Sequence, residues 1–161
     1  MSEKGSQAQG GGPWKVLIVD DNVQNLELLE AYMDELPEVV PTTATNGIDA
    51  IDKVMADPPD LILLDIMMPK MSGFEVCKHL KADPETRDIP IIMVTALNEL
   101  GDMERARECG TDEFLSKPVN RVELATRVRN LLRLRGLKKE LEQSSNKDRG
   151  LGAADVEGGG E

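Results

Sequence analysis

Residues 15–66 read KVLIVDDNVQNLELLEAYMDELPEVVPTTATNGIDAIDKVMADPPDLILLDI, and the pattern of apolar residues in them predicts the fold of the chain. Short apolar runs alternate in it with longer segments whose apolar residues recur at helical spacing, which predicts the order β-α-β-α-β. The alternation continues to about residue 135 and gives five strand–helix units. The runs at 16–19, 61–64 and 91–94 are continuously apolar, as is typical of parallel strands covered on both faces.

The predicted architecture is an α/β fold, with a doubly wound five-stranded parallel sheet and helices on both faces. Five such units favour the flavodoxin-like strand order 2-1-3-4-5. Pro41 has no backbone N–H to donate, so the second strand is expected at an edge of the sheet. In this topology ligands bind beyond the carboxyl ends of strands one and three.

A chain of 161 residues is long enough for one core that needs neither disulfides nor a structural metal. We expect a folded domain over 14–135 and a possible extension of the last helix over 136–143. The polar, glycine-rich ends, 1–13 and 144–161, are predicted to be disordered tails.

The N-terminus does not resemble a signal peptide, and no apolar run is long enough to cross a bilayer. Cys77 and Cys109 lie far apart and form no CxxC pair. They are interpreted as small buried hydrophobes in a reducing compartment. We therefore expect a cytoplasmic protein with no membrane partner.

The net charge of −11 comes from 30 acidic and 19 basic residues and makes nucleic acid an improbable partner. Residues 117–139 nevertheless hold eight Lys or Arg and one acid. A solvated helix face explains them better than nucleic-acid binding, because neither aromatics nor a recognition motif accompany them, and an acidic partner is the other alternative. Leu134, Leu137 and Leu141 predict that the last helix projects and pairs with a second copy or feeds an output module, although Gly136 weakens this prediction.

Polar residues end four of the predicted strands: Asp20 and Asp21, Asp65, Thr95, and Lys117. Three carboxylates in one crevice raise each other's pKa unless a hard cation compensates, and oxygen ligands of this kind suit Mg²⁺. Helix capping explains any single one of these aspartates as well as a functional role does. It does not explain why all of these polar residues follow the carboxyl ends of strands.

The lone His79 lies near Lys78 and Lys81 in the third helix and is interpreted as a solvated surface residue.

At this point the chain resembles the receiver domains of bacterial two-component response regulators over residues 15 to about 135. The similarity rests on LIVDDN at 17–22, LLDIMMPKMSG at 63–73, IIMVTAL at 91–97 and EFLSKP at 113–118.

The resemblance implies that Asp65 accepts a phosphoryl group and that Asp20, Asp21, Asp65 and the Met67 backbone carbonyl bind Mg²⁺. It also implies that Lys117 binds the phosphoryl oxygens and that Thr95 and Phe114 are the switch residues. Lys117-Pro118 is expected to be a cis peptide. Gly73 is explained as a turn or helix-start residue. The alternative for Phe114 is that its aromatic side chain simply packs in the core, which would be favourable whatever the function.

The implied partners are a sensor histidine kinase or histidine phosphotransfer protein and an unknown downstream protein or output domain. A second copy of the chain, through the fourth or fifth helix, is a further expected partner. Surface residues of the first helix would determine which kinase binds. Leu26, Leu29 and Met33 of this helix could instead belong to the hydrophobic core. We expect a switch limited to self-phosphorylation and slow autodephosphorylation, not a turnover enzyme, and either a single-domain regulator or an excised receiver.

Two other classes of protein are alternatives. A haloacid-dehalogenase-type phosphatase shares the Asp, Thr, Lys and Mg²⁺ chemistry but needs Asp-x-Asp on one strand. A phosphorylation-independent scaffold would typically lack one of the acids or the lysine.

Overall fold

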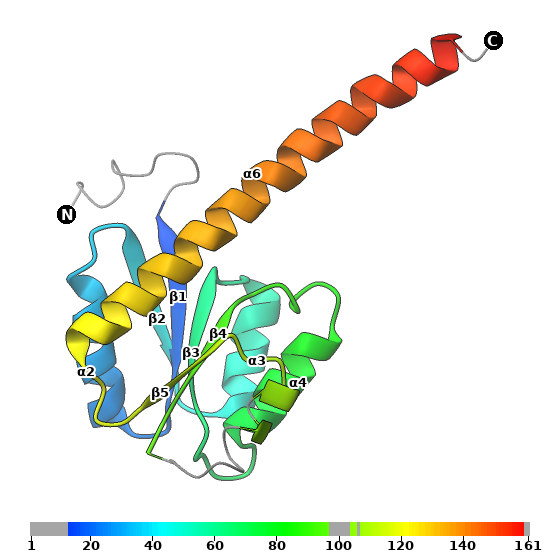
Figure 1. The fold of residues 1–161 in the computed structure, drawn as a ribbon. Helices are drawn as coiled ribbons and strands as arrows, with labels where there is room; N and C mark the ends of the chain where they lie inside the picture. The colour runs from blue at the N-terminus through cyan, green and yellow to red at the C-terminus, as the bar shows by residue number, and fades with distance from the viewer. Residues whose placement is uncertain (1–12, 97–103, 106, 160–161) are drawn as a thin grey trace.

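The computed structural model describes residues 13–96, 104–105 and 107–159, with side chains as far as 144. The elements, in chain order, are β1 (Trp14–Val19), α2 (Val23–Asp34), β2 (Val39–Ala44), α3 (Gly47–Ala56), β3 (Leu61–Asp65), α4 (Gly73–Ala82), β4 (Ile91–Thr95), β5 (Glu113–Ser116) and α6 (Arg121–Gly159). Figure 1 shows the twisted central sheet with helices on both sides of it.

The five strands are parallel and run in the order β2-β1-β3-β4-β5, as predicted. Alternate residues of each central strand face opposite cores. Leu17 and Val19 belong to the core under α3 and α4, whereas Val16 and Ile18 belong to the core under α2 and α6. Both faces are buried, and this explains why the strands are apolar without alternation.

The strand β2 lies at the edge of the sheet, so the interpretation of Pro41 is confirmed. In the first helix Leu26, Leu29 and Met33 are buried. These three residues are therefore core, and kinase recognition by α2 would have to use its other faces.

The helix α6 continues to Gly159, further than residue 143, where the sequence analysis ends the extension. The segment from 144 is rich in glycine and charge, so no apolar periodicity marks it as helical. A helix already formed can add residues without renewed nucleation. Figure 1 shows this end of α6 projecting from the body.

The basic segment 117–139 faces acidic residues of its own domain. Seven of its eight cations form ion pairs, and Arg133 is the exception among the described residues. Examples are Arg121 with Glu35 at 2.8 Å and Arg129 with Glu38 at 3.2 Å. The excess positive charge of the segment is therefore largely neutralised within the chain.

Most of the predicted fourth helix, 98–110, lies outside the described residues, although 104–105 and 107–108 are helical. The predicted tail 1–13 also lies outside them, apart from Pro13. His79 is exposed, Cys77 is buried and Cys109 is half-buried, and both cysteines are free thiols.

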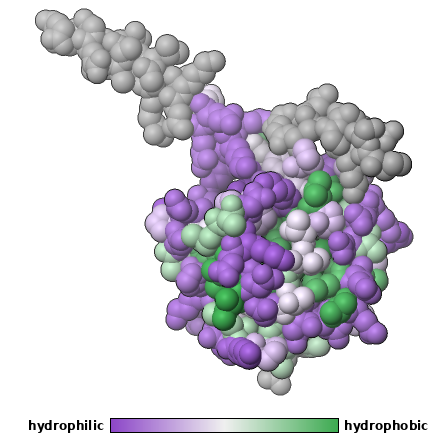
Figure 2. Space-filling model, turned by 180° about the vertical axis from the view of Figure 1, so that it is seen from behind, coloured by the Kyte–Doolittle hydropathy of each residue, from purple (hydrophilic) through white to green (hydrophobic). Residues whose placement is uncertain are grey.

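None of the described helices is both long and apolar enough to span a bilayer. The face seen in Figure 2 is mostly hydrophilic, with separate small groups of hydrophobic residues.

Candidate functional site

The carboxyl ends of the strands bring three carboxylates together. Asp20 follows β1, and Asp65 is the last residue of β3. One ligand oxygen from each of Asp20, Asp21 and Asp65 lies within 4.8 Å of the others. Asp20 is 1% exposed and Asp65 4%, whereas Asp21 is exposed. The prediction that these aspartates share one crevice is confirmed.

The Lys117 ammonium group bridges two of these aspartates. Its Nζ lies 3.0 Å from Oδ2 of Asp20 and 3.3 Å from Oδ1 of Asp65. Lys117 follows β5, and its backbone N–H donates to the carbonyl oxygen of Thr95 at 2.8 Å. This bond holds the start of the Lys117 loop against the end of β4, so both residues lie at the same edge of the sheet.

Thr95 is the last residue of β4 and is fully buried. It lies opposite Ser116 of β5 in the parallel pairing. The Lys117-Pro118 peptide bond is cis, as predicted. Phe114, two residues before Ser116, is half-buried and packs against the core under α3 and α4.

One lysine does not compensate three carboxylates. The pKa of Asp65 is raised from 3.8 to about 6, first by burial and then by the charge of Asp20, and the Lys117 charge offsets only part of this. Burial lowers the pKa of Lys117, but the hydrogen bond to Asp20 and the charge of Asp65 outweigh burial and raise it. Lys117 is therefore a cation, and the crevice keeps a surplus of negative charge.

The backbone around the aspartates is fixed locally. The Asn22 N–H donates to Oδ1 of Asp20 at 2.9 Å, and the Asn22 side chain accepts from Asn25 N–H to cap α2. The turn that begins α2 therefore orients the Asp20 carboxylate, with one oxygen toward Asn22 and the other toward Lys117.

Gly73 has a role that the sequence analysis missed. A Cβ at this position would lie 2.3 Å from the Asp65 carbonyl oxygen and 2.8 Å from Cα of Ile66. The Gly73 N–H also donates to the Ile66 carbonyl oxygen at 2.9 Å. The first turn of α4 thus packs directly on the backbone that carries Asp65, and only glycine leaves room for this approach. The spacing of Asp65 and Gly73 in the sequence gave no signal of the contact.

The donor set fits a hard divalent cation. It consists of carboxylate oxygens, and neither His nor Cys belongs to the cluster found among the described residues. Mg²⁺ prefers oxygen ligands from one or two carboxylates together with water and phosphate oxygens. The surplus negative charge that raises the pKa of Asp65 is the charge that such an ion would neutralise. Met67 lies two residues after Asp65, and its side chain is 61% exposed.

The family model described as the response regulator receiver domain matches residues 16–129, which include the whole crevice. The chain belongs to the response regulator receiver domain family. The receiver is 45% identical over 139 residues to the response regulator PleD of Caulobacter vibrioides, covering 86% of this chain and 30% of PleD. It is 43% identical over 109 residues to the polar-differentiation response regulator DivK of Brucella anthropi, covering 67% of this chain and 87% of DivK.

A solved receiver domain, that of the sensor histidine kinase PA1611 from Pseudomonas aeruginosa PAO1, is also similar. It has a magnesium ion coordinated in its active site cleft. Its TM-score to this receiver is 0.69 at 29% identity, covering 75% of this chain and 98% of that one.

This receiver spans less than a third of PleD. Receiver domains of two-component systems are phospho-accepting switches, and this chain is one of them. Family membership also decides against the haloacid-dehalogenase alternative.

Proposed function

We propose that Asp65 is the phosphoryl acceptor of this receiver and that it acts with Mg²⁺, Lys117 and Thr95. The observation that carries the proposal is the environment of the Asp65 carboxylate. It lies at the tip of the central strand, beside the Lys117 ammonium at 3.3 Å and within 4.8 Å of ligand oxygens from Asp20 and Asp21. With a pKa of about 6 it is mostly ionised at neutral pH and more basic than an ordinary aspartate.

The proposed transfer forms one bond and breaks one. A carboxylate oxygen of Asp65 attacks phosphorus, and an O–P bond forms. The P–N bond of a phosphohistidine donor breaks at the same time, and the imidazole leaves with the electron pair. Lys117 stays protonated throughout, because its raised pKa keeps the ammonium charged, and it offsets the charge on the phosphoryl oxygens.

Asp20, Asp21, Asp65 and the backbone carbonyl of Met67 are the proposed Mg²⁺ ligands. When bound, the ion would neutralise the developing charge on the phosphoryl oxygens and bring them toward the acceptor. The Asp20 carboxylate has a second task in the chain itself. It holds Lys117 at 3.0 Å, so it positions the ammonium group as well as serving as a ligand.

The proposed switch is Thr95 with Phe114. Phosphorylation replaces the charge on Asp65 by roughly −2 and adds acceptor oxygens, to which the Thr95 hydroxyl would donate. Phe114 would change rotamer with Thr95, since β5 carries it beside β4. We expect phosphorylation to shift the fourth predicted helix, 98–110, most of which lies outside the described residues.

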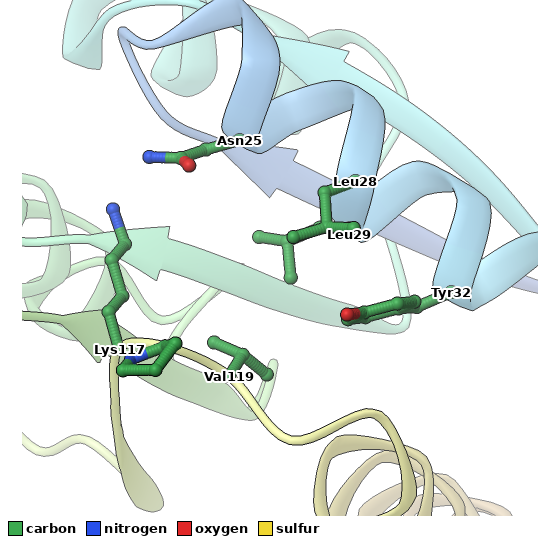
Figure 3. Close-up of a pocket in the computed structure, with 7 residues that line it drawn as sticks. Asn25, Leu28, Leu29, Tyr32, Lys117 and Val119 are labelled. Carbon is green, nitrogen blue, oxygen red and sulfur yellow. The ribbon is translucent and has the colours of Figure 1, made fainter.

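For the phosphodonor protein we propose docking over a pocket of about 400 Å³ between α2 and the loop after β5. Asn25, Leu28, Leu29 and Tyr32 line one side of it, and Lys117, Pro118 and Val119 line the other. Figure 3 shows the Lys117 side chain and the Asn25 amide pointing to the same end of this pocket. Lys117 both lines this pocket and pairs with Asp65 at 3.3 Å, and this link to the acceptor supports the proposed docking position.

The remaining parts of the proposal follow from this chemistry. The receiver is a switch and not a turnover enzyme, limited to its own phosphorylation and slow autodephosphorylation. It works in the cytoplasm, which the two free cysteines support. Its output passes to a downstream protein or an output domain.

Intact-mass spectrometry after incubation with acetyl phosphate tests the acceptor. Wild type with Mg²⁺ should gain one phosphoryl group, and wild type with chelator should gain none. Asp65→Asn should stay unmodified, whereas the control Asp52→Asn, an exposed position on α3, should behave as wild type. Modification of folded Asp65→Asn to the wild-type extent would rule out Asp65.

A panel of purified, autophosphorylated histidine kinases tests the docking pocket. With the kinase that phosphorylates wild type fastest, Leu28→Glu should slow transfer, because Leu28 is exposed at the pocket. Ile48→Glu should not slow transfer, although Ile48, on α3, is 59% exposed against 47% for Leu28. Acetyl phosphate should modify both variants at the wild-type rate. Equal rates of phosphoryl transfer to both variants would contradict docking at the pocket, but would not bear on Asp65 as the acceptor.

A further inference from the structure

The outer face of α6 carries a stripe of leucines that the domain does not cover. Leu134, Leu137 and Leu141 are 59%, 51% and 69% exposed. At about 100° per residue they lie roughly 140–180° around the helix from Leu132, which is buried against the body. Earlier turns of α6 show polar residues on that outer face, such as Glu123 and Asn130, so the stripe begins as the helix leaves the body.

Ion pairs fix the inner face of this part of α6. Asp60 accepts from the Lys15 backbone N–H at 2.9 Å and pairs with Arg135 at 3.4 Å and Lys139 at 3.2 Å. Lys138 pairs with Asp88 at 3.4 Å. These contacts prevent the helix from rotating to bury its leucines on its own domain, so the stripe is presented outward.

Two charged residues flank the stripe without an ion pair of their own. Arg133 and Glu140 have no salt bridge to any residue that the structure describes. They lie on the same side of the stripe, one turn before and one turn after its middle, at equivalent positions of successive heptads. Charges at such flanking positions decide the orientation of paired helices.

We propose that this stripe binds the same stripe of a second copy of the chain, with the two α6 helices antiparallel. With Leu134 of one copy packed on Leu137 of the other, Leu141 lies at the end of the contact near Asn130 of the second copy, and Arg133 lies beside its Glu140. Two-fold symmetry makes this pair twice. A parallel pair would instead bring Arg133 against Lys138 of the second copy and is disfavoured. The contact does not depend on which carboxylate accepts the phosphoryl group.

Sedimentation velocity of the full chain, from about 10 µM to 1 mM, tests the proposal, because a contact this short is expected to be weak. Wild type should associate reversibly into dimers, and Leu137→Asp should be monomeric throughout. Ile48→Asp, at an apolar position on another helix that is 59% exposed against 51% for Leu137, should associate as wild type. Thermal melts should confirm that all three fold. Monomeric wild type at every concentration would overturn the proposal and leave the stripe for a different helix.

A charge exchange tests the orientation. Arg133→Glu and Glu140→Arg should each weaken association by about tenfold, because two exposed pairs become repulsive. The double variant should return to within about twofold of wild type, since both pairs form again with the charges reversed. Tighter association of Arg133→Glu alone would indicate a parallel pair, through Lys138, and would overturn the antiparallel arrangement.

Discussion

Replacing Asp65 by asparagine should make this receiver more stable, although it removes the proposed acceptor. The Asp65 carboxylate is buried, and its pKa is raised from 3.8 to about 6 by burial and by Asp20. The change of pKa corresponds to roughly 3 kcal/mol between the charged and neutral forms, as an upper bound on the cost of the charge. Asparagine has nearly the same shape and no charge, so we expect a gain of about 1–3 kcal/mol at pH 8.

The gain should depend on pH in a defined direction. The native-state pKa lies above that of the unfolded chain, so the native state takes up a proton as the pH falls through about 6. Ionised Asp65 therefore destabilises the fold most above pH 6, and this cost declines as the pH falls toward 4. At pH 5 the advantage of the variant should be smaller by roughly 1 kcal/mol.

Urea unfolding with chelator, at pH 8 and pH 5, measures both effects. Mg²⁺ added at pH 8 should stabilise wild type more than Asp65→Asn, since the carboxylate is a proposed ligand. Equal free energies of unfolding for the two proteins at pH 8 would show that the negative charge of Asp65 does not destabilise the fold. A larger stability advantage of Asp65→Asn at pH 5 than at pH 8 would contradict the raised pKa.

Three further changes have expected outcomes. Gly73→Ala should cost about 2–4 kcal/mol in urea unfolding and slow phosphorylation, because its Cβ would overlap the Asp65 carbonyl oxygen; wild-type stability would contradict the proposed close approach. Lys117→Ala should slow phosphorylation by acetyl phosphate about 100-fold, while Lys53→Ala, an exposed cation on α3, should change it little; equal rates would remove Lys117 from the chemistry. Asp60→Asn should lower the free energy of unfolding by about 1–2 kcal/mol and speed amide exchange over residues 134–144. Asp57→Asn, at a more exposed position, should lower it by less than about 0.5 kcal/mol. Unchanged amide exchange in Asp60→Asn would mean that Asp60 does not hold α6.

Much of the fold and the crevice follows from the sequence for a simple reason. Strands buried on both faces must be apolar throughout, so the polar residues that end them are conspicuous. Parallel strands then bring Asp20, Asp65, Thr95 and Lys117 to one edge of the sheet whatever the loops do. The edge position of β2 could also be predicted, because Pro41 has no backbone N–H to donate to a neighbouring strand.

Contacts between elements that are distant in the sequence could not be predicted in this way. The basic residues of α6 fit a solvated helix face, with an acidic partner as the alternative, until the fold shows that Glu35, Glu38 and Asp60 face them. The approach of Gly73 to Asp65 depends on how the loop between them folds back. The switch roles of Thr95 and Phe114 stay predictions, because they concern a second conformation.

The most direct test of the account is to map the phosphorylated residue itself. After modification by acetyl phosphate with Mg²⁺, borohydride reduction converts an aspartyl phosphate to homoserine, which peptide mass spectrometry locates. We expect homoserine at residue 65 and unmodified aspartate at 20 and 21. Homoserine at 20 or 21 with Asp65 intact would contradict the assignment of Asp65 as the acceptor.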